Sequence, residues 1–211
     1  MVLISLKAIS LSNHLRDLEE KYPQSTGNHL LILLPPSEKK SVLPGPAISV
    51  YTGVLDQGLG WATLNKSAQN RAQKSIAIIS AKYGVVRPLD LIGPYKEKID
   101  SAKMRGPITH KLESIETDLI VDCRSSTYQG VWNPPAKKCV EIKIFTQVDG
   151  VKKVITHMSK KTRGEVTRLL MLSKSVPTNP QELKDIVALD FTCELIEANG
   201  KKPWVLEVIA Q

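Results

Sequence analysis

The sequence lacks the features that stabilise secreted, metal-bound or membrane-spanning folds. Its three cysteines include no Cys-x-x-Cys pair, which argues against a zinc ribbon or a disulfide framework. Its four histidines are scattered along the chain, so no spacing supports a metal site. The longest clean apolar run, residues 30–34, is far shorter than the ~20 residues of a membrane-spanning helix. We therefore expect neither a metal nor a membrane partner.

We do not expect the N-terminal residues to act as a signal peptide. Residues 1–11 are mildly apolar, but Ser5, Lys7 and Ser10 interrupt the continuous apolar core that such a peptide requires. Residues 10–21 then read as a short amphipathic helix. We expect a cytoplasmic protein in which residues 1–29 form an N-terminal extension of unknown role and residues 30–211 form one domain.

The charge balance is basic. Lys and Arg total 29 against 21 Asp and Glu, which gives a formal net charge of +8. This excess favours a partner that carries phosphate, such as a nucleic acid, a nucleotide or an anionic metabolite. Charge alone does not choose among these partners, and a solvated basic surface is an alternative explanation.

The apolar pattern predicts a mixed α/β (α+β) fold with flanking helices. Three short apolar runs are typical of buried parallel strands, whereas later segments pair around Asp149-Gly150 and Asn199-Gly200, which are hairpin signals. The expected strands are 30–34, 76–80, 119–123, 140–145, 151–158, 191–196 and 204–209. The expected helices are 64–74, 101–116, 162–174 and one that begins at Asn179 and Pro180.

Each early strand runs into a loop with cations and hydroxyl groups. In open α/β sheets, ligands bind outside the carboxyl ends of parallel strands, so these loops are expected to converge on one pocket. A polar strand exit without function is the alternative for each loop. The loops contribute Ser37, Glu38, Lys39 and Lys40 from the first, Lys82, Tyr83 and Arg87 from the second, and Asp122, Arg124, Ser125 and Tyr128 from the third.

A fourth segment, residues 156–164, leads from an expected strand into a helix. Backbone N–H groups at a helix start attract anions, and Lys160, Lys161 and Arg163 add positive charge. The chain has no P-loop motif, so ATP hydrolysis of that kind is not expected. Cys123 is either a reactive thiol beside Arg124 or a small buried apolar side chain.

Several blocks of the sequence resemble the peroxide stress protein YaaA family, in its actinobacterial branch. The stretch from Leu33 to Ser41 (LLPPSEKKS) is similar to the family's LLPPSEGKT, with Lys40 at the position of the motif lysine. The further matching blocks are YTGVL at 51–55, SAKYGVVRPLD at 80–90, IGPYK at 92–96, DCRS at 122–125 with Tyr128, and HMSKKTRG at 157–164. Together they extend from about residue 30 to the C-terminus.

The resemblance implies a cytosolic bacterial protein of the hydrogen peroxide response, linked to limiting free iron, with a compact α/β fold and a basic cleft. It also implies a helix-hairpin-helix associated with DNA binding. That element would fall before Tyr51, where this chain has only residues 42–50. The chain therefore resembles a shortened and diverged member.

We expect the cleft to bind an anionic partner through cations and hydroxyl groups, with three carboxylates that orient them. The expected anion-binding residues are Ser37, Lys40, Tyr51, Thr52, Arg87, Arg124, Ser125, Lys160, Lys161 and Arg163, and the orienting carboxylates are Glu38, Asp90 and Asp122. DNA is one candidate partner. The alternative is an enzyme acting on a phosphorylated or nucleotide-like small molecule, although the sequence identifies neither a nucleophile nor a cofactor.

Overall fold

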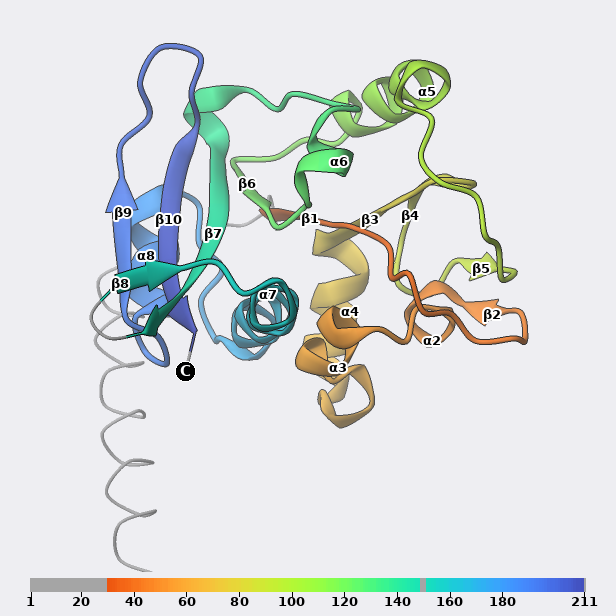
Figure 1. The fold of residues 1–211 in the computed structure, drawn as a ribbon, viewed down its shortest axis with the longest axis horizontal. Coiled ribbons are helices and arrows are strands. Elements are labelled where there is room, and N and C mark those ends of the chain that lie inside the picture. Colours follow the sequence, from red (N-terminus) through yellow and green to blue (C-terminus); the bar gives the residue numbers. More distant parts are fainter. Residues whose placement is uncertain (1–29, 149–150, 211) are drawn as a thin grey trace, which may run out of the picture.

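A computed structural model describes residues 30–148 and 151–210, which form one α/β domain around an eight-stranded mixed sheet (Figure 1). The strand order is β4-β3-β1-β6-β7-β10-β9, and β8 pairs with β7. The strands are β1 Leu30–Leu34, β3 Ile76–Ser80, β4 Gly84–Val86, β6 Leu119–Asp122, β7 Cys139–Val148, β8 Val151–Lys153, β9 Cys193–Ile196 and β10 Trp204–Ala210. A separate pair joins β2 (Gly45–Pro46) to β5 (Leu91–Ile92).

The centre of the sheet is parallel. β1 lies between β3 and β6 and is parallel to both, and β6 continues in parallel to β7 and then β10. Every residue of β1, β3 and β6 is buried, as expected for strands covered on both faces. The carboxyl ends of these three adjacent strands therefore meet at one edge of the sheet.

Helices cover both faces. On one face, α4 (Lys66–Ser75) packs on β1 and α7 (Thr156–Leu172) packs on β7 and β10, in an apolar cluster that includes Leu30, Ile32 and Leu34 of β1. On the other face, α5 (Ser101–Glu113) covers Leu31 and Leu33, and Figure 1 shows it on the far side of the sheet from α7. The remaining helices are α2 Ala47–Val50, α3 Val54–Leu59, α6 Ser126–Gln129, α8 Pro180–Val187 and the 3-10 helices η1 Trp61–Thr63 and η2 Ala136–Lys138.

Helices α3 and α7 make an unusually close contact through two glycines. A Cβ added to Gly164 would overlap the Leu55 carbonyl oxygen and lie 2.8 Å from the Leu59 nitrogen. A Cβ added to Gly58 would overlap the carbonyl oxygen of Lys161. Only hydrogen in place of a side chain lets the two backbones approach this closely.

The structure confirms the mixed α/β fold, the three buried strands and the C-terminal antiparallel pair of β9 and β10. Asn179 caps α8 as predicted by accepting a hydrogen bond from the Glu182 backbone. The expected strand over residues 151–158 was wrong beyond 153, because α7 begins at Thr156 and buries small residues against its neighbours. Helix α3 was not anticipated. The predicted helix at 10–21 and the turn at 149–150 lie outside the described residues.

Candidate functional site

A cavity of about 940 Å³ opens at the carboxyl edge of β1 and β6. Its walls come from five segments that are distant in the sequence. They are the loop after β1 (35–40), the start of α3 (52–57), the segment that follows β5 (95–99), the loop after β6 (125–128) and one face of α7 (157–163). The parallel order of β1 and β6 places the first and fourth segments side by side.

Positive side chains outnumber negative ones in the cavity wall. The cations are Lys39, Lys40, Lys96, Lys98, Lys160 and Arg163, and the carboxylates are Glu38, Asp56 and Glu97. Hydroxyl groups of Ser37, Thr52, Ser125, Thr127 and Tyr128 complete the polar lining. Such a set of donors suits oxyanions, which accept several hydrogen bonds at once.

One face of α7 contributes three of these side chains. His157, Lys160 and Arg163 follow each other at three-residue spacing, which keeps them on the same side of the helix. Lys160 Nζ lies 3.5 Å from Glu38 Oε1. The Nε of Arg163 is buried and has no hydrogen-bond acceptor within residues 30–148 and 151–210. Lys161 lies outside this lining and pairs with Glu165 one turn further along.

The start of α3 contributes a carboxyl group with an altered pKa. Asp56 Oδ2 accepts a hydrogen bond of 3.0 Å from the backbone of Gly53, where the helix begins. Burial raises the pKa of Asp56 to about 6, although hydrogen bonds from the Gly53 and Asp56 backbones and the Ser37 hydroxyl oppose the rise. This acid therefore titrates close to neutral pH.

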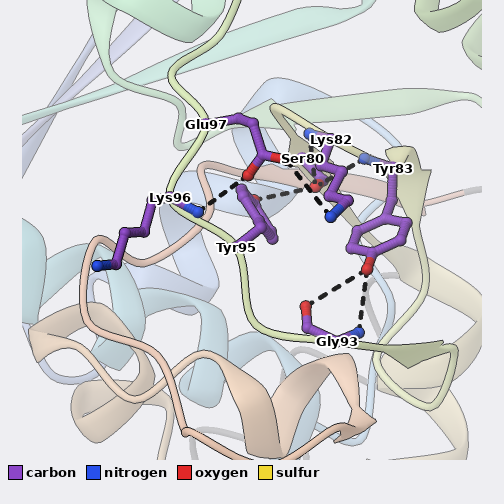
Figure 2. Close-up of polar contacts among 7 residues, drawn as sticks. All are labelled: Ser80, Lys82, Tyr83, Gly93, Tyr95, Lys96 and Glu97. Carbon is purple, nitrogen blue, oxygen red and sulfur yellow. Dashed lines mark hydrogen bonds and ion pairs between the residues drawn. The ribbon is translucent and has the colours of Figure 1, made fainter.

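A cluster of hydroxyl groups holds the Tyr95 ring in the cavity wall. The Tyr95 hydroxyl accepts a hydrogen bond from Ser80 Oγ and shares another with the Tyr51 hydroxyl, each 2.9 Å long. Ser80 in turn accepts from the backbones of Lys82 and Tyr83 (Figure 2). Burial raises the pKa of the Tyr51 phenol far above its ordinary range, so it stays protonated.

The Lys40 ammonium lies on these aromatic rings. Its Nζ is 4.3 Å from the centroid of the Tyr95 ring and 6.0 Å from that of Tyr51. Loss of solvent lowers the pKa of Lys40, while Glu38 and Glu97 act in the opposite direction. Burial also raises the pKa of Tyr128, another residue of the cavity wall, to about 12.

Arg124 does not line the cavity. It is buried in the interior, where Nε and Nη2 donate to the two carboxylate oxygens of Asp122. Its remaining donors reach the carbonyl oxygens of Tyr128 and Trp132. Both members of this pair therefore hold the loop after β6 in place, and neither faces the anion pocket that the sequence suggested.

Arg87 is also placed elsewhere. Its guanidinium donates to the carbonyl oxygens of Lys74 and Ile76, at the beginning of β3. The reason is topological: β4 runs antiparallel to β3 and returns the chain to the opposite edge of the sheet. Asp90 accepts a hydrogen bond from the Arg87 backbone and stabilises the turn there.

The structure thus brings together part of the expected set. The residues that line the cavity are Ser37, Glu38, Lys40, Thr52, Ser125, Lys160 and Arg163, whereas Tyr51, Arg87, Asp90, Asp122, Arg124 and Lys161 do not. The cavity wall also contains six residues that were not predicted for the site, namely Asp56, Tyr95, Lys96, Glu97, Lys98 and His157. Tyr95 and Lys96 belong to a matching family block, and Gly53-x-x-Asp56 has the spacing of a helix cap, so both signals were present.

Cys123 is fully buried, and burial raises its pKa to about 12, so it is an interior side chain and not a reactive thiol. In the described part of the chain, no three His, Cys, Asp or Glu side chains gather in a way that could hold a metal ion. No helix of residues 30–148 and 151–210 has the length and apolar character needed to cross a membrane.

The chain is similar in sequence to known proteins. The profile of the family described as Peroxide stress protein YaaA matches residues 6–195. A UPF0246 protein of Corynebacterium efficiens is 32% identical, with 97% of this chain and 80% of the relative covered. A UPF0246 protein of Streptomyces coelicolor is 30% identical, with 78% and 68% covered, and one of Ruegeria pomeroyi is 28% identical, with 66% and 60% covered.

This chain belongs to the YaaA family of peroxide stress proteins. The family match begins at residue 6 and so includes most of the segment 1–29.

Proposed function

We propose that this protein is a cytoplasmic member of the hydrogen peroxide response that binds a small phosphorylated or nucleotide-like anion in the cavity at the carboxyl edge of β1 and β6. The observation that carries the proposal is the cationic wall of the cavity, in which six positive side chains outnumber three carboxylates. Arg163 is one of these cations, and its Nε is buried without an acceptor in the described structure.

The size and lining of the cavity support a small ligand. A volume of about 940 Å³ lies within the range of small-molecule sites, which is roughly 300–1,000 Å³. The six cations exceed the three carboxylates by three, so a ligand with several negative charges would reduce the excess positive charge of the site. The Lys160 ammonium, paired with the exposed Glu38, is free to exchange that partner for a phosphate oxygen.

Two neighbouring lysines of α7 provide the test. Lys160 lines the cavity, whereas Lys161 pairs with Glu165 outside it, so Lys160→Gln and Lys161→Gln remove the same charge from different places. We expect calorimetric titration with inorganic phosphate, pyrophosphate and nucleotides to find a saturable ligand. Lys160→Gln should weaken its binding by about 10- to 150-fold, since a charge-assisted hydrogen bond contributes ~1.5–3 kcal/mol, and Lys161→Gln should not. Equal losses in both variants would refute the site.

The physiological part of the proposal rests on family membership. Deletion of the gene is expected to reduce survival under hydrogen peroxide and to raise chelatable iron. A deletion strain that matches its parent in both measurements would contradict the role in peroxide stress.

Nucleic acid is a second candidate partner because the net charge is +8. Such binding depends on released counterions and weakens steeply with salt. Titration of duplex and single-stranded DNA at two salt concentrations distinguishes it from the small anion. A ligand that enters the cavity should compete only weakly with DNA bound to the outer surface.

A further inference from the structure

We propose that Lys40 forms an imine with the carbonyl group of a phosphorylated aldehyde or ketone bound in the cavity. The inference deepens the proposed function and rests on it, because the cations of α7 would hold the phosphate of the same ligand.

Lys40 is held in a fixed position by its backbone. Its backbone forms an isolated antiparallel bridge with Tyr51. Hydrogen bonds flank this bridge on both sides, from the Ser41 nitrogen to the Val50 oxygen at 2.8 Å and from the Thr52 nitrogen to the Lys39 oxygen at 3.1 Å. The side chain therefore starts from a backbone that is held in place and does not belong to a free loop.

The ring of Tyr95 forms a fixed surface beneath the Lys40 amine. The Tyr95 ring, 4.3 Å below Nζ, is fixed by hydrogen bonds to Tyr51 and Ser80 and by edge contacts with the rings of Tyr51 and Tyr83. Figure 2 shows Tyr95 between Ser80 and the segment that carries Lys96 and Glu97. An amine supported in this way on one side is presented to the cavity on the other.

Within the described residues, the Lys40 amine has no ion-pair or hydrogen-bond partner that would compete with a ligand. Lys40 Nζ forms no ion pair or hydrogen bond with any residue in 30–148 or 151–210, and it is half-buried, whereas Lys39, Lys96 and Lys98 are exposed. Lys82, which lies nearby, is paired with Glu97 at 3.4 Å. Partial removal from water lowers the pKa of Lys40, whereas Glu38, Glu97 and the Tyr95 ring favour the ammonium. The neutral amine that forms in the cavity is the nucleophilic form, and lysines of this kind attack carbonyl carbons.

The reaction balances without an oxidant or a metal. The Nζ lone pair forms a bond to the carbonyl carbon, and the π electrons of the C=O bond move to oxygen. The two protons that nitrogen loses are taken by this oxygen, which leaves as water when the C=N bond forms. The products are therefore one imine and one water molecule. The phosphate takes no part in bond making and serves only to hold the ligand against Lys160 and Arg163.

Pyridoxal 5′-phosphate is a suitable probe because it is an aldehyde that carries a phosphate. The full chain is incubated with a limiting amount, reduced with borohydride and mapped by peptide mass spectrometry. We expect Lys40 to be labelled several times faster than Lys39, its exposed neighbour. Lys40→Arg, which keeps the charge but cannot form an imine, should lose this label, and Lys39→Arg should keep it. Lys40→Met serves as a second variant if Lys40→Arg fails to fold, as judged by circular dichroism.

The outcomes separate the two proposals. Labelling of Lys40 no faster than Lys39 would overturn the imine inference, and phosphate binding would still be decided by the Lys160→Gln and Lys161→Gln pair. Pyridoxal without phosphate should label Lys40 less, and inorganic phosphate should slow the labelling by pyridoxal 5′-phosphate. Equal labelling by both aldehydes would overturn the phosphorylated substrate class and count against the proposed function.

Discussion

Arg124 and Asp122 are joined side by side in the interior by two parallel hydrogen bonds, Nε to Oδ1 at 2.9 Å and Nη2 to Oδ2 at 2.8 Å. The Arg124 side chain is completely shielded from solvent and that of Asp122 is 4% exposed. Arg124 Nη2 also donates to the Trp132 carbonyl oxygen. The pair therefore stabilises the segment between β6 and η2 from inside the protein. Part of this segment lines the cavity, but the two charges that hold it lie outside the cavity.

Arg124→Ala is therefore expected to destabilise the protein. Loss of the guanidinium leaves the Asp122 carboxylate buried without its partner, which typically costs ~3–5 kcal/mol of unfolding free energy. Urea unfolding of the variant and wild type measures the difference. If Arg124→Ala unfolds at the wild-type midpoint and loses ligand affinity instead, the guanidinium belongs to the binding site.

Arg87→Ala should likewise reduce stability and leave anion binding unchanged. Its guanidinium links the carbonyl oxygens of Lys74 and Ile76, where α4 gives way to β3. Loss of these bonds is expected to lower the unfolding free energy by ~1.5–3 kcal/mol. Thermal unfolding and phosphate titration of the same preparation check both halves. A weakened phosphate affinity in a variant of normal stability would contradict the placement of Arg87.

Gly164→Ala should force α3 away from α7. The added methyl group would overlap the Leu55 backbone, and such overpacking costs ~1–3 kcal/mol. Because α3 supplies Asp56 to the cavity, we also expect weaker ligand binding.

Gly106→Ala is the matched control, because a Cβ at Gly106 in α5 meets no atom within 4 Å other than those of its chain neighbours. The gain in helix propensity of ~0.5–1 kcal/mol is opposed by contact with Pro107, so the net change in stability should be small. Differential scanning calorimetry measures the change in stability that each of the two substitutions causes. A Gly164→Ala variant as stable as Gly106→Ala would contradict the close helix contact.

Asp56 predicts a particular pH dependence of stability. Its pKa rises from 3.8 to about 6 on folding, so the folded state binds more protons than the unfolded state between these values. The unfolding free energy should therefore fall as the pH rises through this window, by up to ~3 kcal/mol from this group. Asp56→Asn removes the titration. The difference between the unfolding free energies of wild type and Asp56→Asn, measured as a function of pH, isolates the contribution of Asp56. A difference that does not change with pH would contradict the raised pKa of Asp56.

The sequence predicted the parallel centre of the fold because its apolar runs are unambiguous. The predicted strands at 30–34, 76–80 and 119–123 are long enough for one strand, too short for a helix and bounded by polar segments, and β6 ends one residue earlier than predicted. Helix α3 was not predicted because it holds only six residues. It contains Gly58 and lies between Gly53 and Gly60, and glycines at this density suggest a loop. The start of α7 was predicted as a strand because the apolar and polar residues from 151 to 158 follow neither a strand period nor a helix period clearly, so the pattern allows either structure.

The site was harder to predict, since proximity depends on strand direction. Lys40 and Arg163 could be selected because their segments follow the carboxyl edge of the sheet or the helix that packs beside it. Arg87 could not be placed, because nothing in the sequence indicates that β4 turns back along β3. A buried Arg124 also resembles a ligand-binding arginine in sequence, and only its pairing with Asp122 reveals the difference.

The place of β10 in the sheet has a consequence for how the protein is made. This strand lies between β7 and β9, and it pairs in parallel with β7 from Val140 opposite Trp204 to Thr146 opposite Ala210. During synthesis, β7 leaves the ribosome long before β10 and presents an unpaired edge in the interval. Closure of the sheet must await a contact between segments far apart in the chain, which slows folding. Nascent chains are therefore most prone to aggregate after α7 has emerged and before β10 has, and chaperone demand should peak there.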